Sequence, residues 1–310
     1  MPMSSPEHLV DLARRYIATD PIAIYQAYSA IRDMGVRGEV SALLLDGPPG
    51  TGKTYLARII AEFLKAQTLR FQFTAGCGRK DLLFDEAFAT ENNPRGEGIL
   101  PRALRANRES EETLVVHLDE MDKASEDVDG FLLNFLQEGL LSHPQFGDQY
   151  AVADRLLVII TKNDQRNLSS ALMRRCRVAY MAWPSLEAET AILLSHHEWL
   201  TPDACEALLT LPRQLRINPA VRKPPSTPEL VRAVYDLADM ARRRPDEELI
   251  GELYKSACAQ FPADQKFIEK STRYWGCLIL ETFASLPIPE RTGPRATQSL
   301  EFLDTIMPSQ

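Results

Sequence analysis

A glycine-rich segment separates an apolar run at residues 40–45 from a predicted helix over 53–66. The segment consists of Gly47, Pro48, Pro49, Gly50, Thr51, Gly52, Lys53 and Thr54. Its spacing is G-x-x-x-x-G-K-[ST], and a strand before it and a helix after it form the setting in which such a loop binds phosphate. Glycines let backbone N–H groups close around phosphate oxygens, and the helix N-terminus adds partial positive charge. We therefore expect these eight residues to bind a nucleotide. Lys53 would reach the β- and γ-phosphates, and Thr54 would ligate Mg²⁺.

Further apolar runs of strand length alternate with helical segments along the first half of the chain. Strands are predicted at 40–45, 69–73, 114–118 and 156–161; helices are predicted within 6–35 and at 53–66, 101–108 and 127–138. This alternation predicts a mainly parallel sheet with helices on both faces, because crossover helices must cover the sheet. The fold class is therefore α/β, with a P-loop sheet and flanking helices.

The pattern changes near residue 184, beyond which only helices are predicted. Their ranges are 185–198, 202–211, 227–243, 246–260 and 264–283. We accordingly predict a core domain over 1–183, a helical domain over 184–285 and a proline-containing tail over 286–310. In the tail, Leu300, Leu303 and Met307 share helical spacing.

Composition excludes several classes of protein. No uncharged apolar run approaches the roughly 18–20 residues that a membrane span needs, and the N-terminus lacks the pattern of a secretory signal. The net charge of −8 argues against a non-specific nucleic-acid binder. The five cysteines are scattered and contain no C-x-x-C pair, which predicts reduced thiols and a cytoplasmic protein.

Two carboxylates, Asp119 and Glu120, end the apolar run that begins at residue 114. Downstream of a phosphate-binding loop, this pattern predicts that Asp119 supports the magnesium ion. Glu120 would then orient and deprotonate the attacking water. A strand that merely runs into an acidic loop is the structural alternative, and the upstream loop makes it the weaker one.

Polar residues also follow the strand predicted at 156–161. Asn163 could bond to the water or the γ-phosphate, although Asn-Asp is also a common turn dipeptide. Arg174 and Arg175 are either a solvated surface pair or a source of an arginine finger, a guanidinium delivered to the γ-phosphate of a neighbouring subunit.

In their order and spacing these segments resemble the Walker A, Walker B, sensor-1 and arginine-finger elements of an AAA+ ATPase. The chain further resembles the MoxR-type branch of that family, over about residues 20–245. The segments that point to the branch are FQFT at 71–74, RKDLL at 79–83, GILPRAL at 98–104, LDEMDKA at 118–124, RRC at 174–176 and KPPSTPEL at 223–230.

The resemblance implies an ATP- and Mg²⁺-dependent ATPase that forms a ring, usually a hexamer, with each active site at a subunit boundary. Asn163 would be sensor 1. Arg175 is the first choice for the finger that acts on the neighbouring subunit, and Arg174 is its close competitor. The preference for adenine over guanine rests on the resemblance alone.

Three further family features are expected from the resemblance. Residues 84–99 match a helix-2 insertion and residues 140–155 match a pre-sensor hairpin, so Phe146 and Tyr150 are candidates for substrate contact or for packing under the hairpin. The helical region after residue 184 resembles the family's lid domain. One departure concerns sensor 2, normally an arginine, because the corresponding segment here reads STPEL; Lys223 and Arg232 lie nearby without fitting the motif.

The function implied is the remodelling or activation of a protein client, in the manner of a chaperone, with a von Willebrand factor A-domain protein as a possible adaptor. Two alternatives remain open at this point. One is an NTP-driven nucleic-acid motor subunit of a restriction or defence system, which the acidic charge disfavours. The other is a slow nucleotide-dependent assembly switch, which the intact Asp119–Glu120 pair disfavours.

Overall fold

The structure is a computed structural model, and it describes residues 6–16, 20–36, 39–90, 96–145, 147–163, 165–243, 246–259, 261–268 and 270–288. Phe146 and the tail positions Leu300, Leu303 and Met307 lie outside the described residues. The chain divides into two compact units, residues 1–188 and 189–310. Each unit is described by itself.

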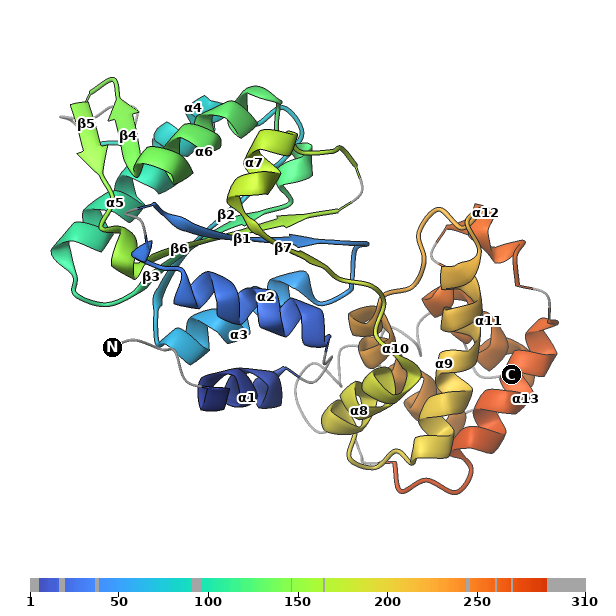
Figure 1. Cartoon of the computed structure of the whole chain (residues 1–310). Coiled ribbons are helices and arrows are strands. Elements are labelled where there is room, and N and C mark those ends of the chain that lie inside the picture. Colours follow the sequence, from blue (N-terminus) through green and yellow to red (C-terminus); the bar gives the residue numbers. More distant parts are fainter. Residues whose placement is uncertain are drawn as a thin grey trace. The chain divides into compact units, whose positions relative to one another are not determined.

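A five-stranded parallel sheet forms the centre of the first unit, with the strand order β2-β3-β6-β1-β7 (Figure 1). Its strands are β1 Ser41–Asp46, β2 Gln67–Gln72, β3 Leu114–Asp119, β6 Leu156–Lys162 and β7 Arg177–Tyr180. A separate antiparallel hairpin pairs β4 Leu140–His143 with β5 Gly147–Tyr150. The predicted fold class is confirmed, and the hairpin expected within 140–155 is present.

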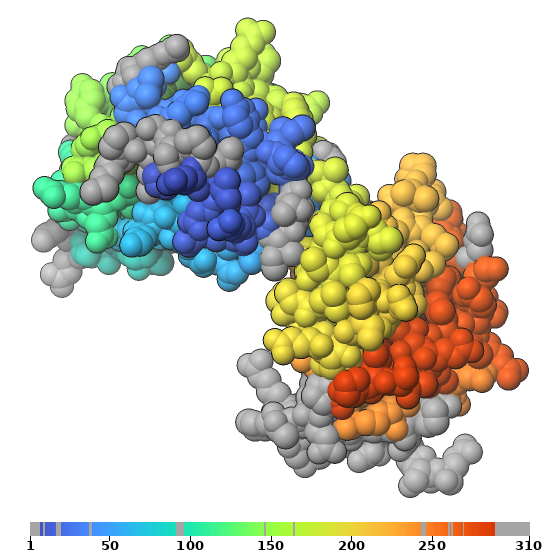
Figure 2. Space-filling view, turned by 60° about the horizontal axis from the view of Figure 1, so that its bottom comes forward, coloured from blue at the N-terminus to red at the C-terminus, as the bar shows by residue number. Residues whose placement is uncertain are grey.

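Helices cover both faces of this sheet (Figure 1). One face carries α1 Pro6–Arg15, α2 Pro21–Arg32 and α3 Lys53–Leu64. The other carries α4 Arg79–Leu83, α5 Ile99–Glu109, α6 Asp127–Glu138 and α7 Ser170–Arg175. Figure 2 shows α1 and α2, in blue, together at the surface of this unit.

Strand β1 shows why the sheet requires helices on both of its faces. All six of its residues are buried. Leu43 and Leu45 pack in the core formed with α1, α2 and α3, whereas Ala42 and Leu44 pack in the core formed with α5 and α6. Successive side chains of a strand point to opposite faces, so a run that is apolar at every position is satisfied only when both faces are covered.

The second unit is built from helices around its own apolar core. Its helices are α8 Leu186–His196, α9 Pro202–Ile217, α10 Thr227–Arg243, α11 Glu247–Cys258, α12 Pro262–Gln265 and α13 Thr272–Phe283. Leu209, Ile250, Tyr254, Trp275 and Ile279 are among its fully buried side chains. No helix among the described residues has the length and apolar character needed to cross a bilayer.

Some predicted elements differ from the structure. The single helix predicted over 264–283 is wrong, because α12 and α13 are separate. The side chain of Ser271 starts α13 by accepting a hydrogen bond from the Tyr274 N–H at 3.2 Å. The helix predicted over 202–211 continues to Ile217, past Pro212. Strand β7 and helices α4 and α7 were not predicted, since each has only four to six residues.

Candidate nucleotide-binding site

The glycine-rich loop lies between the carboxyl end of β1 and the first turn of α3, as the sequence predicts. Gly47 has φ 151°, and a Cβ at this position would lie 2.1 Å from the Met181 carbonyl oxygen. Gly52 has φ 93° and precedes α3, whose N-terminus receives no side-chain capping bond. The free N–H groups of that turn, together with the helix dipole, form a site suited to anions.

Lys53 is buried against this loop. Its Nζ donates to the carbonyl oxygens of Gly47 and Pro48, both at 2.6 Å, and Thr51 Oγ1 donates to the same Pro48 oxygen at 3.0 Å. These carbonyl oxygens hold the Lys53 ammonium group against the loop. The loop therefore carries a cation at the position where the sequence predicts phosphate binding.

Asp119 lies across from Thr54, with 3.4 Å between Thr54 Oγ1 and Asp119 Oδ1. Its carboxylate accepts hydrogen bonds from Thr161 and Arg70, and His117 Nε2 lies 3.5 Å from Oδ1. Burial by itself would raise the pKa of Asp119. Hydrogen bonding with His117, Thr161 and Arg70 outweighs that effect and holds the pKa well below its ordinary value.

Glu120 occupies the left-handed backbone region, at φ 58° and ψ 45°, which is uncommon for a residue with a side chain. Its N–H donates to Thr161 Oγ1 at 3.0 Å, so the neighbouring strand β6 holds this turn. Oε2 accepts from Lys123 Nζ at 2.7 Å and from Gln72 Nε2 at 3.0 Å. Burial opposes ionisation, but Lys123 and Gln72 lower the pKa of Glu120, which keeps it a carboxylate at neutral pH.

Asn163, at the end of β6, meets the same carboxylate. Its Nδ2 lies 3.4 Å from Glu120 Oε1. Beside it, buried Lys162 forms an ion pair of 2.8 Å with Asp46, which ends β1. Strands β1, β6 and β3 are adjacent and parallel, so their carboxyl ends bring the glycine-rich loop, Asn163, Asp119 and Glu120 to one edge of the sheet.

The sequence interpretation did not identify several residues that hold the two carboxylates. They are Arg70, Gln72, His117, Lys123 and Thr161. Residues 70 and 72 lie one pleat apart on β2, whose register places Gln72 beside Asp119. The alternation of polar residues along 67–72 is the signal that could have indicated them, because alternate positions share one face.

An open cleft of about 280 Å³ adjoins the loop at Thr51. Residues from two distant stretches of the first unit line it: Tyr16, Asp20, Pro21, Met181, Ala182, Trp183, Pro184 and Ser185. The Tyr16 hydroxyl is buried and has no hydrogen-bond partner among the described residues. A partly apolar cleft with an unused hydroxyl suits a planar ring that carries hydrogen-bonding atoms.

Arg174 and Arg175 lie at the opposite, amino-terminal edge of the sheet. They end α7 just before β7, where Arg177 pairs in register with Leu43 of β1. The length of β1 separates this edge from the glycine-rich loop by roughly 17 Å, at about 3.3 Å per residue. The structure therefore unites the glycine-rich loop, Asp119, Glu120 and Asn163, but not the two arginines.

The structure describes Tyr150 of the expected hairpin and the residues near sensor 2, whereas residues 91–95 of the expected insertion lie outside the described residues. Tyr150 on β5 is 59% exposed, so it does not pack under the hairpin. Lys223 Nζ pairs with Glu229 at 3.1 Å, and Arg232 Nε donates to the Pro228 carbonyl at 3.2 Å, so both side chains contact the start of α10.

The residues around Thr54 fit a magnesium ion held jointly with phosphate. Thr54 and Asp119 offer hydroxyl and carboxylate oxygens, which Mg²⁺ prefers, and the lowered pKa keeps Asp119 ionised. No group of three or more His, Cys, Asp or Glu side chains in the described part of the chain forms a cage for a metal ion. Mg²⁺ usually keeps several waters and binds through one or two protein ligands and substrate phosphates, so Thr54 and Asp119 would be sufficient protein ligands.

Comparison with known proteins agrees with this geometry. Residues 42–176 match the AAA domain family, dynein-related subfamily. The Lon protease of Heliobacterium modesticaldum is 30% identical over 177 residues, 54% of this chain and 21% of that protein. Replication-associated recombination protein A of Escherichia coli K12 is 24% identical over 230 residues, 72% of this chain and 45% of that protein. The chain thus spans less than half the length of either relative.

Among solved structures, the Saccharomyces cerevisiae Hsp104–ADP complex aligns with a TM-score of 0.49 at 19% identity, over 67% of this chain and 44% of that one. The matched residues 42–176 run from β1 to the end of α7 and contain every residue of the site except the cleft side chains. Residues 42–176 therefore resemble the AAA domain family, and the parallel sheet with helices on both faces has the architecture of a P-loop NTPase core.

Proposed function

We propose that this chain is a MoxR-like AAA+ protein that hydrolyses ATP in a ring of subunits and thereby remodels or activates a protein client. The observation that carries the proposal is the meeting of Thr54 with Asp119, and of Asn163 with Glu120, at one edge of the sheet. The finger arginines lie at the other edge, so a complete site requires a second copy of the chain.

Each residue has a definite part in this proposal. Lys53 leaves its loop carbonyls to neutralise the β- and γ-phosphates, and the N–H groups of the loop bind the remaining phosphate oxygens. Glu120 accepts the proton of the attacking water, which Asn163 orients. Thr54 and Asp119 would hold Mg²⁺, which supplies positive charge to the phosphates when it is bound.

The cleft beside Thr51 is proposed to take the nucleobase. Trp183 offers a ring for stacking, and the Tyr16 hydroxyl gains a partner if it bonds to a ring atom. This would supply the base-contacting residues that the sequence alone did not indicate. Residues 184–285 are proposed as the lid domain and residues 286–310 as the tail.

Ring assembly and a protein client are the finer parts of the proposal. A hexamer and a von Willebrand factor A-domain adaptor come from the resemblance to the MoxR branch. The exposed Tyr150 on the β4–β5 hairpin supports contact with a client. The five free cysteines support a reducing, cytoplasmic location.

A substrate trap tests the proposed activity. In Glu120→Gln the dissociation constant for ATP·Mg²⁺ should stay within about threefold of the original, while hydrolysis falls by roughly 10²–10⁴-fold, the usual contribution of a general base. Lys53→Ala should lose ATP binding. Glu111→Gln is the matched control, because Glu111 is exposed just before β3. Unchanged hydrolysis in Glu120→Gln would contradict the assigned base.

The same trap tests the class of client. Glu120→Gln, purified in ATP·Mg²⁺, should retain a stoichiometric protein that Lys53→Ala does not. One relative is named for replication-associated recombination, so nucleic acid is the alternative tested. Nuclease-sensitive material that dissociates in moderate salt, with no protein bound, would replace the remodelling proposal by a nucleic-acid motor.

A further inference from the structure

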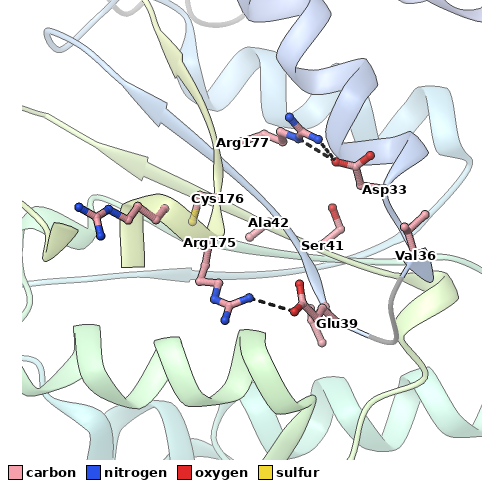
Figure 3. A pocket seen from close by; sticks show the side chains of 10 residues that line it. Asp33, Val36, Glu39, Ser41, Ala42, Arg175, Cys176 and Arg177 are labelled. Carbon is pink, nitrogen blue, oxygen red and sulfur yellow. Dashed lines mark hydrogen bonds and ion pairs between the residues drawn. The ribbon is translucent and has the colours of Figure 1, made fainter. Parts of the chain in front are cut away.

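We infer that Glu39 is a positioning residue for Arg175, and that Arg175 rather than Arg174 is the arginine presented to a neighbouring subunit. This inference rests on the proposed function, since it concerns the finger of a shared active site. The observations that carry it come from a hollow of about 370 Å³ at the amino-terminal edge of the sheet (Figure 3).

Three arginines line this hollow, and their engagements differ. Arg177 directs both Nε and Nη2 to one oxygen of Asp33, with Nε at 2.7 Å, so an edge of its guanidinium is occupied. Among the residues that the structure describes, Arg175 is bonded through Nη1 alone, which donates to Glu39 Oε1 at 2.9 Å (Figure 3). Within the described part of the chain, no hydrogen bond or ion pair is found for the Arg174 side chain, which is exposed.

Hydrogen bonds fix the two residues that follow Glu39, whose carboxylate holds Arg175. Glu39 lies two residues before β1, and the N–H of the next residue, buried Val40, donates to the Leu136 carbonyl at 3.1 Å. The next residue, Ser41, donates its hydroxyl to the Ala30 carbonyl at 2.7 Å. The backbone beside Glu39 is thus bonded to α2 and α6, and the Glu39–Arg175 pair connects the end of α7 to this fixed point.

Because Arg175 bonds to Glu39 through Nη1, its other guanidinium nitrogens remain available. A guanidinium has five N–H donors in a plane and binds phosphate best through two parallel bonds. With Nη1 on Glu39, the donors on Nε and Nη2 remain for a phosphate oxygen pair. In Arg177 the same two nitrogens, Nε and Nη2, are already bonded to Asp33. Arg174 keeps its full rotamer freedom, which it would lose on binding phosphate.

We expect Glu39 to orient the Arg175 side chain rather than to stabilise the fold. The two side chains are about one-third exposed, at 34% for Arg175 and 38% for Glu39, and exposed ion pairs contribute little to folding. Loss of Glu39 should therefore leave the fold and the neighbour's ATP affinity intact. It should lower the rate at which the neighbour's bound ATP is hydrolysed.

A subunit-mixing experiment tests this directly. The acceptor subunit carries Arg175→Ala, which keeps its own nucleotide site but has no finger. The donor carries Glu120→Gln, which binds ATP without hydrolysing it and keeps Arg175. Neither should hydrolyse ATP alone, and the mixture should be active, because fingers contribute about 10³–10⁵-fold in rate.

Glu39→Ala is then placed in one partner at a time. In the donor it should lower kcat of the mixture about 3–10-fold with KM for ATP unchanged, and Glu39→Gln, which keeps an acceptor oxygen, should restore at least half of the activity. In the acceptor it should have no effect. A loss that follows the acceptor would overturn the inference, because Glu39 would then act on its own glycine-rich loop through β1.

Controls separate the failure of this inference from failure of the proposed function. Glu62→Ala in the donor should change nothing, since Glu62 belongs to another exposed pair, 3.6 Å from Arg58. Arg174→Ala in the donor should cost less than Arg175→Ala, and the reverse order would overturn the assignment of the finger. An inactive starting mixture would contradict the shared site itself. An active mixture that ignores Glu39→Ala would contradict only the positioning role.

Discussion

At the level of single residues, Asp119 and Glu120 are adjacent in sequence but have different surroundings. Asp119 is buried and held by Thr161, Arg70 and His117 on the side of Thr54. Glu120, in a left-handed backbone conformation, turns instead toward Gln72 and Lys123. Such conformations persist only where neighbours enforce them, and here the bond from the Glu120 N–H to Thr161 does so.

Gly47 provides a prediction at this scale. Gly47→Ala should lower the free energy of unfolding by about 3 kcal/mol and weaken ATP binding, because the new Cβ would lie 2.1 Å from the backbone oxygen of Met181. Gly76→Ala is the matched control. Gly76 also has a positive φ, 89°, but no atom lies within 4 Å of its added Cβ, so the loss should be about 1 kcal/mol. Chemical denaturation and nucleotide titration measure both effects, and equal losses in the two variants would contradict the steric argument.

At the level of elements, buried polar contacts connect the helices of the second unit. Glu189 on α8 is fully buried and accepts from Arg213 at 2.9 Å, Arg216 at 2.6 Å and Thr227 Oγ1 at 2.7 Å. These partners belong to α9 and α10. One carboxylate therefore fixes how three helices pack.

Glu189→Ala should destabilise the helical unit by about 3–5 kcal/mol. The substitution removes the carboxylate that pairs with Arg216, and a buried charge left without its partner is strongly destabilising. Arg216 is only 3% exposed at its side chain, so water cannot replace the lost bonds without local opening. Glu198→Ala, at an exposed position just beyond α8, is the control and should change stability by less than about 0.5 kcal/mol. Urea denaturation followed by circular dichroism measures the difference. A small loss would show that the helices pack independently of this carboxylate.

The start of α10 has a pH-dependent contact. Ser226 donates to Glu229 through both N–H and Oγ, each at 2.8 Å, which resembles one half of a capping box. Burial would raise the pKa of Glu229, but bonds from Ser226 and Lys223 lower it below its ordinary value of 4.5. A lowered pKa means that this stabilisation is present above pH 4.5 and is lost as pH falls through the lowered value.

Glu229→Gln should therefore cost about 1 kcal/mol of unfolding free energy at pH 7 and progressively less as the pH falls below 4.5 through the lowered pKa, where the original carboxyl becomes neutral too. The measurement is denaturant unfolding of both proteins across that pH range. Glu206→Gln, on the exposed side of α9, should show no such pH-dependent difference. A constant difference between Glu229→Gln and the original protein would contradict the linkage.

At the level of the whole molecule, the two edges of one sheet carry two parts of one proposed active site. The glycine-rich loop, Asp119, Glu120 and Asn163 lie at the carboxyl edge, and Arg174 and Arg175 at the amino edge. A side chain cannot span the strand between them. Hydrolysis should therefore require contact between copies, whereas nucleotide binding should not.

The rate of ATP hydrolysis per subunit should accordingly rise at least about tenfold as protein concentration increases through the assembly range, because the finger contribution is large. Fluorescent-nucleotide titration at high dilution should still detect binding, since Lys53, Thr54 and Asp119 belong to one chain. A rate per subunit that does not change with concentration would contradict the shared site.

Local sequence was sufficient for much of the fold and for half of the site. The pattern at 47–54 predicts a strand, a loop and a helix. Its first glycine is required by the structure, because only glycine tolerates the φ of 151° at residue 47 and the closeness of this residue to Met181. Apolar runs predicted β1, β2, β3 and β6. Short elements escaped prediction, since four to six residues such as those of β7 carry too little periodicity.

The sequence alone determined that this chain has a parallel α/β core with a glycine-rich loop between a strand and a helix, because those features follow from contiguous residues and their spacing. Tertiary structure alone decided which residues hold Asp119 and Glu120, what lines the cleft beside Thr51, and that Glu39 holds Arg175. Each of these depends on residues tens of positions apart in the chain, which meet only when parallel strands align in register and bring their ends to common edges.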